Sequence, residues 1–290
     1  LTRRLHRLST LMDGFQESDF TSRSAYAKDK TRRGDEVDRL GYTFDRMAER
    51  IREQLDQLKR QDSLRRQLVA RVSHDLRTPL AALQGYMESL SLKRRELSNR
   101  EQSEYVDLAL RQSRRLSRQL DELFELASLD ARETQPQCEA FTLAELLQDV
   151  LQKYQLRAEQ AQVRLQLSPP GRLPFVHGDI GLTERVLENL LENAFTHTPH
   201  GGAITLDTLH QGDRIMISVK DTGPGISEED QAHLFEPFYQ SESGSRSRLH
   251  VGLGLAIARR IIELQQGEIG VQSRLGQGAV FYFTLPVSAP

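Results

Sequence analysis

The chain has 290 residues, a net charge of -2 and a single cysteine, Cys138. This length predicts two or three domains, and the balanced charge gives no reason to expect a nucleic-acid partner. One cysteine excludes an internal disulfide. No run approaches the roughly 20 apolar residues that a membrane helix needs, so none of these residues is expected to span a bilayer.

The first 58 residues are predicted to form helices that need a partner. Apolar residues recur at helical spacing over residues 1–15, and a second 3–4 pattern covers residues 37–58 after a polar connector at 16–34. Two such helices cannot bury their apolar faces alone. We therefore expect dimerisation into a four-helix bundle.

The next segment predicts an antiparallel helical hairpin. The apolar pattern continues from Leu64 to Leu90, breaks over residues 93–100, and resumes in a helix from about Glu101 to Asp130. Ser98 and Asn99 in the break indicate a turn and a helix N-cap. The wide apolar face of this hairpin again calls for a second copy.

The character of the chain changes near Pro136, where glycine and proline become frequent. Helical patterns at about 143–160, 180–195 and 254–265 alternate with short β-rich runs, which predicts an α+β domain of about 150 residues. The runs cover residues 163–167, 203–206, 214–220, 268–271 and 279–285.

The string Ser-His-Asp-Leu-Arg-Thr-Pro-Leu at residues 73–80 lies inside the predicted first hairpin helix. Pro79 is costly there and would bend the helix one turn beyond His74. A neutral imidazole is a good nucleophile near pH 7, the Asp75 carboxylate could orient it, and Thr78 shares its helix face. A lone helical histidine would be read as an ordinary polar surface residue, but this whole string favours chemistry.

These eight residues resemble the phosphoacceptor box of sensor histidine kinases. The resemblance implies that His74 takes the γ-phosphoryl group of ATP, that Asp75 assists proton transfer, and that Thr78 supports dephosphorylation of the response regulator. Residues 1–58 are similar to the signal-relay (HAMP) module of these receptors. Together with the basic cluster near Leu1, this predicts the cytoplasmic portion of an inner-membrane protein, anchored by a segment upstream of this fragment.

Three further motifs point to a nucleotide. Asn189 and Asn193 lie at i,i+4 on a predicted helix, and amide oxygens suit Mg²⁺, although capping or surface asparagines are the commoner explanation. Asp221 ends a predicted strand before Gly223, Gly225 and Ile226, where a carboxylate could accept a hydrogen bond from the adenine amino group. An ordinary Gly-Pro turn is the alternative for this second motif.

The third motif, Gly252-Leu253-Gly254-Leu255, opens a predicted helix, and such turns bind phosphates through backbone N–H groups. The polar residues 241–250 before it suit a lid.

In this order the motifs resemble the ATP-binding domain shared by histidine kinases, type II topoisomerases and two further ATPase classes. The resemblance makes Asn193 the Mg²⁺ ligand, with Asn189 in support, and makes Phe235 and Phe238 anchors of the lid. The expected nucleotide-binding residues are Asn189, Asn193, His197, Asp221, Gly223, Gly225, Ile226, Phe238, Gly252, Leu253, Gly254 and Leu255.

Some positions depart from the family pattern. A basic residue is common where this chain has Thr196, and we expect Arg246 or Arg248 to replace its phosphate contact. His197 stands in for a tyrosine that stacks on adenine. His250 occupies a frequent glycine position, and Ala279 replaces a frequent hydroxyl residue.

The sequence thus predicts a multidomain homodimer. Relay helices cover residues 1–58, a dimerisation and phosphotransfer hairpin covers 59–133, and an α+β two-layer sandwich that binds ATP and Mg²⁺ covers 138–290. The expected activity is autophosphorylation of His74 and transfer to an aspartate of a response regulator, which docks near Gln84, Met87 and Ser89. The alternatives are an ATPase of the same superfamily and a pseudokinase scaffold.

Overall fold

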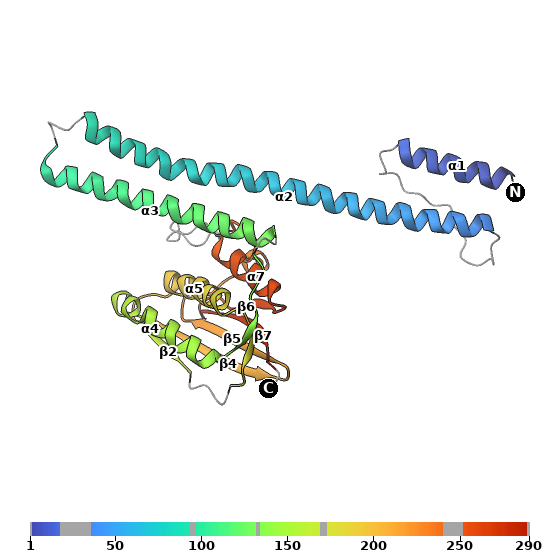
Figure 1. The fold of residues 1–290 in the computed structure, drawn as a ribbon. Coiled ribbons are helices and arrows are strands. Elements are labelled where there is room, and N and C mark those ends of the chain that lie inside the picture. The colour runs from blue at the N-terminus through green and yellow to red at the C-terminus, as the bar shows by residue number, and fades with distance from the viewer. Residues whose placement is uncertain are drawn as a thin grey trace. The chain divides into compact units, whose positions relative to one another are not determined.

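The structure is a computed structural model that describes residues 2–17, 36–92, 97–131, 134–168, 173–239 and 252–288. The chain folds as two compact units, Leu1–Val72 and Ser73–Pro290 (Figure 1). No helix within the described ranges combines the length and the apolar character that crossing a membrane requires.

The first unit contains helix α1 (Thr2–Glu17) and the first part of helix α2 (Glu36–Leu92). Its core forms where Leu8 and Phe15 of α1 meet Phe44 and Ala48 of α2, and the two phenylalanine rings pack edge to face at 5.8 Å. The predicted helices are therefore confirmed. A second row of apolar side chains on α2 stays exposed, namely Leu40, Met47 and Leu58.

Helix α2 continues into the second unit without ending at Pro79. A bend at this proline stays a prediction, as does a domain boundary at residue 59. Helix α3 (Asn99–Asp130) starts at the expected N-cap: the Ser98 hydroxyl accepts a hydrogen bond from the Glu101 N–H, and the Glu101 carboxylate accepts one from the Ser98 N–H. Tyr86 of α2 and Tyr105 of α3 are in contact across the hairpin, with ring centroids 6.0 Å apart.

The rest of the second unit is built on a five-stranded sheet in the order β2-β4-β5-β7-β6. Strand β2 runs parallel to β4, and the remaining pairs are antiparallel. The five predicted β-rich runs correspond to β2 (Arg164–Leu167), β4 (Ala203–Gln211), β5 (Arg214–Asp221), β6 (Ile269–Ser273) and β7 (Ala279–Pro286).

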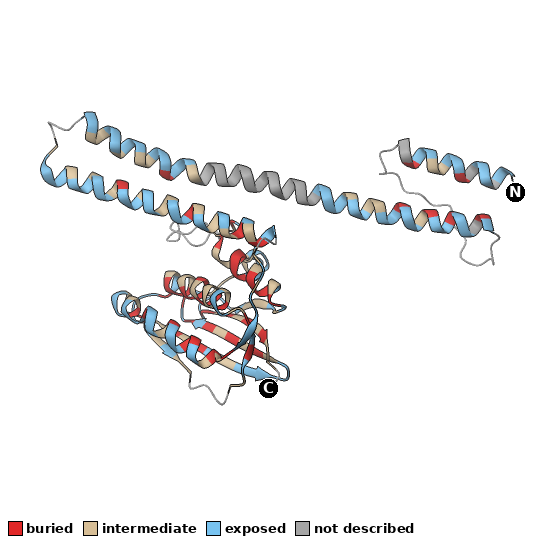
Figure 2. Cartoon of the chain, in the orientation of Figure 1, coloured by how far each residue is buried: buried red, intermediate tan, exposed pale blue. Residues whose placement is uncertain are grey.

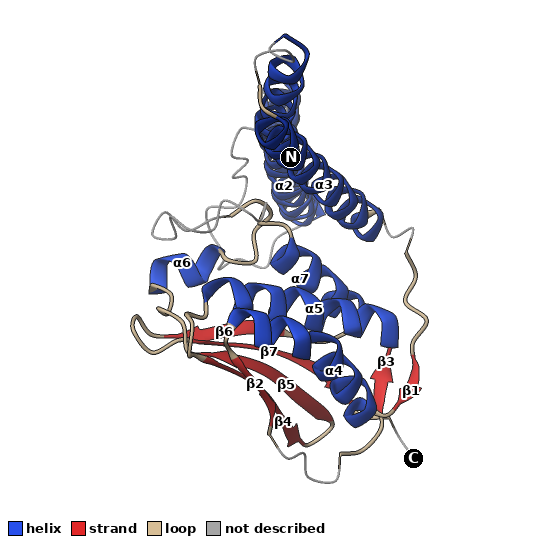
Figure 3. Cartoon of the chain, turned by 90° about the vertical axis from the view of Figure 1, so that its left-hand side faces the viewer, coloured by secondary structure: helices blue, strands red, loops and turns tan. Residues whose placement is uncertain are grey.

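Three helices cover one face of this sheet (Figure 3). They are α4 (Leu143–Ala161), α5 (Ile180–His197) and α7 (Gly254–Leu264). Their inner faces and alternate residues of the strands form the core, which is coloured as buried in Figure 2. The predicted two-layer sandwich of helices and sheet is confirmed.

Three short elements were not predicted from the sequence. Strands β1 (Glu139–Phe141) and β3 (Val176–Gly178) pair with each other as a separate antiparallel ribbon, and helix α6 (Glu228–His233) follows the loop after β5. With three to six residues each, they are too short to show a hydrophobic period.

Helix α3 also contacts the α+β domain, which the sequence did not suggest. Leu126 and Leu129 are buried near its C-terminal end, where α3 packs against α7. Glu125 accepts hydrogen bonds from both Nε and Nη2 of Arg185 on α5, at 2.7 to 3.1 Å. Arg260 of α7 pairs with Asp130 at 3.1 Å. Both ion pairs join the hairpin to the sandwich.

Candidate functional site

Strand alternation decides where Asp221 points. In β5 the residues Ile215, Ile217 and Val219 are fully buried on the helix-covered face, and successive side chains point to opposite faces. Asp221 is two residues beyond Val219 and is 4% exposed. Its carboxylate therefore lies on the inner face of the sheet, among apolar core residues, as a buried charged group that needs partners.

Within the described part of the chain, the hydrogen bonds to the Asp221 carboxylate converge on one of its two oxygens. Oδ1 accepts from the Gly223 N–H at 2.7 Å and from the Ala279 N–H at 3.3 Å. Burial raises the pKa of the Asp221 carboxyl above its ordinary value, although these two N–H groups and the nearby His197 oppose the shift. The arrangement leaves Oδ2 to accept from a ligand, as recognition of an amino group requires.

The loop after Asp221 is held by its own backbone contacts. A Cβ at Gly223 would lie 2.9 Å from the His197 carbonyl oxygen, and one at Gly225, where φ is 76°, would lie 2.0 Å from the Arg274 carbonyl oxygen. Both glycines are thus required by close approach of the chain to itself. Their role in admitting an adenine ring stays a prediction.

Helix α5 carries the two asparagines on one face, as the i,i+4 spacing predicts. Asn189 is 8% exposed, and its Nδ2 has no hydrogen-bond partner among the described residues. A Cβ at Gly254 would lie 3.4 Å from its Oδ1, so this amide adjoins the first residue of α7. Asn193, one turn further along, is half-buried. A buried donor without a partner is costly, which indicates that Asn189 faces a ligand or water.

The N-terminus of α7 adjoins Asn189 and forms, with α5 and the end of β5, one corner of the domain. Its N-cap residue Leu253 provides no side-chain hydrogen bond to the first-turn N–H groups. Such groups, together with the positive end of the helix dipole, favour an anion. Leu253 is 1% exposed, while Gly254 and Leu255 are half-buried, and the start of α7 adjoins Asn189.

Asn189 and Asn193 contribute two side-chain amides to this corner. No cluster of three or more histidine, cysteine, aspartate or glutamate side chains occurs within the described residues. Mg²⁺ fits such a donor set, because it binds through few protein oxygens and keeps phosphate and water ligands. The Asn193 amide oxygen would hold it, with Asn189 beside it.

The remaining predicted nucleotide residues lie around the same corner. His197 ends α5 with an exposed side chain close enough to influence the Asp221 charge. Ile226 is fixed by a hydrogen bond from its N–H to Ser273 Oγ at 2.9 Å. Phe238, 3% exposed, donates its N–H to the Gly252 carbonyl oxygen at 2.9 Å. Residues 241–250, including Arg246, Arg248 and His250, lie outside the described residues.

The phosphoacceptor string lies on α2. His74 and Asp75 belong to this helix, but their side chains lie outside the described residues. Pro79 is buried on the hairpin, whereas Thr78 is exposed. The predicted association of Thr78 with His74 on one helix face follows from their four-residue spacing.

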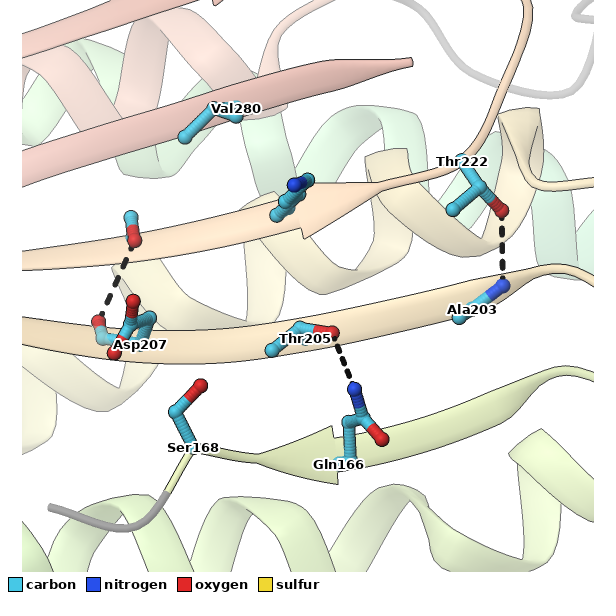
Figure 4. Close-up of a pocket in the computed structure, with 9 residues that line it drawn as sticks. Gln166, Ser168, Ala203, Thr205, Asp207, Thr222 and Val280 are labelled. Carbon is cyan, nitrogen blue, oxygen red and sulfur yellow. Dashed lines mark hydrogen bonds between the residues drawn. The ribbon is translucent and has the colours of Figure 1, made fainter. Parts of the chain in front are cut away.

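A separate groove of 490 Å³ lies on the opposite, open face of the sheet (Figure 4). Its lining includes Ser218 and Lys220, which alternate with the buried residues of β5. Several of its hydroxyls already have partners, such as Thr205 Oγ1, which accepts from Gln166 Nε2 at 3.0 Å. None of the predicted nucleotide-binding residues lines it.

Sequence reasoning missed two glutamines that fix the backbone of the elements around the site. Gln231 donates Nε2 to the carbonyl oxygens of Ile226 and Ser273. Gln265, 3% exposed, accepts from the Asp179 N–H at the start of α5. Each acts through tertiary contacts, and no local pattern distinguishes either from a surface glutamine.

Comparison with known proteins agrees with this geometry. Residues 64–132 match the His Kinase A (phospho-acceptor) domain, and residues 178–289 match the histidine kinase-, DNA gyrase B- and HSP90-like ATPase domain. The chain is 32% identical over 288 residues to the adaptive-response sensory kinase SasA of Crocosphaera subtropica, covering 97% of this chain and 72% of that protein.

Two solved structures share the fold. The histidine kinase AdeS of Acinetobacter baumannii superposes with a TM-score of 0.59 at 25% identity, over 74% of this chain and 98% of that one. Full-length ShkA, solved with AMPPNP, has a TM-score of 0.58 at 29% identity, over 77% of this chain and 47% of that one. The chain spans 35 to 63% of the length of four other curated relatives. It belongs to the sensor histidine kinase family.

Proposed function

We propose that this chain binds ATP in the corner formed by α5, α7 and the end of β5, and transfers its γ-phosphoryl group to His74. The observation that carries the proposal is the buried Asp221 carboxylate, with one oxygen held by two backbone N–H groups and the other left for a ligand. An adenine amino group supplies the missing donor. Guanine has a carbonyl oxygen in that place, which would face the carboxylate unfavourably.

The phosphates extend from this adenine site toward the start of α7. Asn189 Nδ2 donates to a phosphate oxygen, which would satisfy its unpartnered N–H, and the first N–H groups of α7 add further donors. The Asn193 amide oxygen would hold Mg²⁺, which would neutralise charge at the phosphates. Arg246 or Arg248 replaces the basic residue that family members commonly have at Thr196.

At the hairpin, a neutral imidazole nitrogen of His74 attacks the γ-phosphorus while the bond to the ADP oxygen breaks. Asp75 orients the imidazole and accepts its proton. The phosphohistidine then donates its phosphoryl group to an aspartate of a response regulator, which docks at Gln84, Met87 and Ser89. Of these three, Gln84 and Met87 are exposed on α2. Thr78 supports the reverse, hydrolytic reaction.

The hairpin and the relay helices act as a homodimer. Support comes from large apolar side chains that remain exposed on α2 and α3, where a second hairpin would bury them: Leu80, Val106, Leu110 and Phe124. The exposed Leu40, Met47 and Leu58 form a similar row in the first unit, consistent with a HAMP-like relay bundle. In this proposal a segment upstream of residue 1 anchors the protein in the inner membrane.

The test is labelling of the full chain with γ-³²P ATP, in the wild type and in His74→Gln. Acid-labile, base-stable phosphate on the wild type alone, transferable to a receiver domain, is the expected result. ATP hydrolysis without protein phosphate would instead indicate an ATPase, and failure to bind ATP would indicate a scaffold. Label on His74→Gln would show that another residue accepts the phosphate.

A further inference from the structure

Phe238 has a backbone conformation that aromatic residues rarely adopt. Its φ is 65°, in the left-handed region, and its side chain is 3% exposed. Such a conformation persists only where the surrounding structure holds it in place. The strained residue also makes a specific contact, because its N–H donates to the Gly252 carbonyl oxygen at 2.9 Å.

This contact links Phe238 to the phosphate end of the site. Gly252 has a φ of 76°, and a Cβ there would lie 2.5 Å from the Tyr239 carbonyl oxygen. The chain at residues 238–239 therefore runs directly against Gly252. Two residues later α7 begins at Gly254, beside the Asn189 amide. A shift of the backbone at Phe238 would move the first turn of α7.

Tyr239, the next residue, connects this part of the backbone to neighbouring groups. Its hydroxyl donates to Asp230 Oδ1 at 2.6 Å, and its N–H donates to the Glu236 carbonyl oxygen at 3.2 Å. Its ring also contacts the His233 ring, with centroids 5.6 Å apart. Tyr239 thereby connects the strained residue to α6.

Asp230 is itself well placed as the acceptor. It lies in the first turn of α6, and its N–H donates to Oγ of the N-cap residue Ser227 at 3.1 Å. The hydrogen bond to Asp230 raises the pKa of Tyr239 to about 12, because it stabilises the protonated phenol. The contact is thus a charge-assisted hydrogen bond between groups fixed on both sides.

We propose that Tyr239 and Asp230 form a positioning pair, which keeps Phe238 in its strained conformation and so sets the affinity of the adjoining site for ATP. Neither residue is expected to touch the nucleotide. The pair acts through the Phe238–Gly252 contact on the start of α7. This inference rests on the proposed function of the corner as an ATP site.

The experiment measures ATP binding by calorimetry, and autophosphorylation KM and kcat, on the full chain with Mg²⁺ present. Tyr239→Phe removes the donor, Asp230→Ala removes the acceptor, and Asp230→Asn keeps a neutral acceptor. Tyr282→Phe is the matched control, because it removes a tyrosine hydroxyl from β7, away from this corner.

A hydrogen bond to a charged group typically changes an equilibrium by roughly tenfold or more. We therefore expect Tyr239→Phe and Asp230→Ala each to raise Kd and KM for ATP about tenfold, with kcat within about twofold of wild type. The double variant should be no weaker than either single variant, since both remove the same contact. The Kd of Asp230→Asn for ATP should stay within about threefold of the wild-type value, and the Kd of Tyr282→Phe should equal the wild-type value.

Wild-type affinity in Tyr239→Phe would overturn the inference. An equal loss of ATP affinity in Asp230→Asn and Asp230→Ala would also overturn it, because the charge of Asp230 and not its hydrogen bond would then set the affinity. A fall in kcat at unchanged KM would overturn it as well. Thermal unfolding identifies any variant that fails to fold, and the two Asp230 variants then still decide the question. If the wild type itself binds no ATP, the proposed function fails, whereas a defect confined to the variants concerns only the pair.

Discussion

Replacing Asp221 by asparagine should separate ligand recognition from folding stability. The carbonyl oxygen of the new side chain can still accept from the N–H groups of Gly223 and Ala279, as Asp221 Oδ1 does. The other atom becomes an NH₂ group, which would meet the adenine amino group donor to donor. A buried donor left unpaired costs about 1–3 kcal/mol, so the Kd for ATP should rise about 10- to 100-fold.

The same substitution should leave the ligand-free protein as stable as the wild type, or more so, at pH 7. Because burial raises the pKa of the Asp221 carboxyl from its ordinary 3.8, the folded state favours the protonated form. The stability that this group contributes is therefore fully present below pH 3.8 and is lost as the pH rises through the raised pKa. Asparagine is neutral throughout, so its advantage should shrink as the pH falls toward about 4.

The assay combines calorimetric titration with ATP and GTP and thermal unfolding between pH 4 and 8. Since the asparagine NH₂ can donate to the guanine carbonyl oxygen, the preference for ATP over GTP should narrow. Asp213→Asn, at an exposed position in the turn before β5, is the matched control. Unchanged ATP affinity would show that Asp221 does not bind adenine. A melting temperature several degrees below wild type at pH 7 would refute the argument from burial.

Substitutions at three further places test the framework around the site. Ser98→Ala removes the capping box of α3 and should lower the free energy of unfolding by about 1 kcal/mol, measured by urea titration; an unchanged midpoint would contradict this. Glu125→Ala or Arg185→Ala should speed hydrogen exchange in the last turns of α3, and the charge-swapped pair should restore protection if the ion pair is responsible. Gly225→Ala should destabilise the fold by about 2 kcal/mol or more, because φ is positive and the Cβ meets a backbone oxygen. Gly212→Ala, with positive φ but open space around the Cβ, should cost less; equal losses would exclude the steric explanation.

The contact between α3 and the sandwich has a consequence for the proposed reaction. Glu125 pairs with Arg185 and Asp130 pairs with Arg260, and the side chains of Glu125 and Arg185 are 27% and 32% exposed. Ion pairs that remain partly in water contribute little to stability, because water can replace either partner at low cost. The ion pairs therefore oppose a release of α3 only weakly, and most of the cost would come from exposing the buried Leu126 and Leu129 side chains.

Periodicity in the sequence determined the long elements. Apolar residues recur at helical spacing over residues 5–15, 37–58 and 116–126, and the five strands of the main sheet correspond to β-rich runs. These periods arise because one face of each element is buried, so a short stretch of sequence is enough to recognise the element. The motifs around His74, Asn189, Asp221 and Gly254 were likewise visible, because their residue types and spacing match a known family.

Only the tertiary structure decided how those motifs work together. The alternation of side chains along β5 places Asp221 on the inner face, where the N–H of Ala279, 58 residues later, donates to it. Phe238, whose φ is positive, contacts Gly252 through a backbone hydrogen bond. Tyr239 and Asp230 became partners through the orientation of α6. Such contacts depend on groups distant in the chain, whose approach is set by the packing of the whole domain. A local pattern records which side chain is present, but not which buried donor or acceptor it meets.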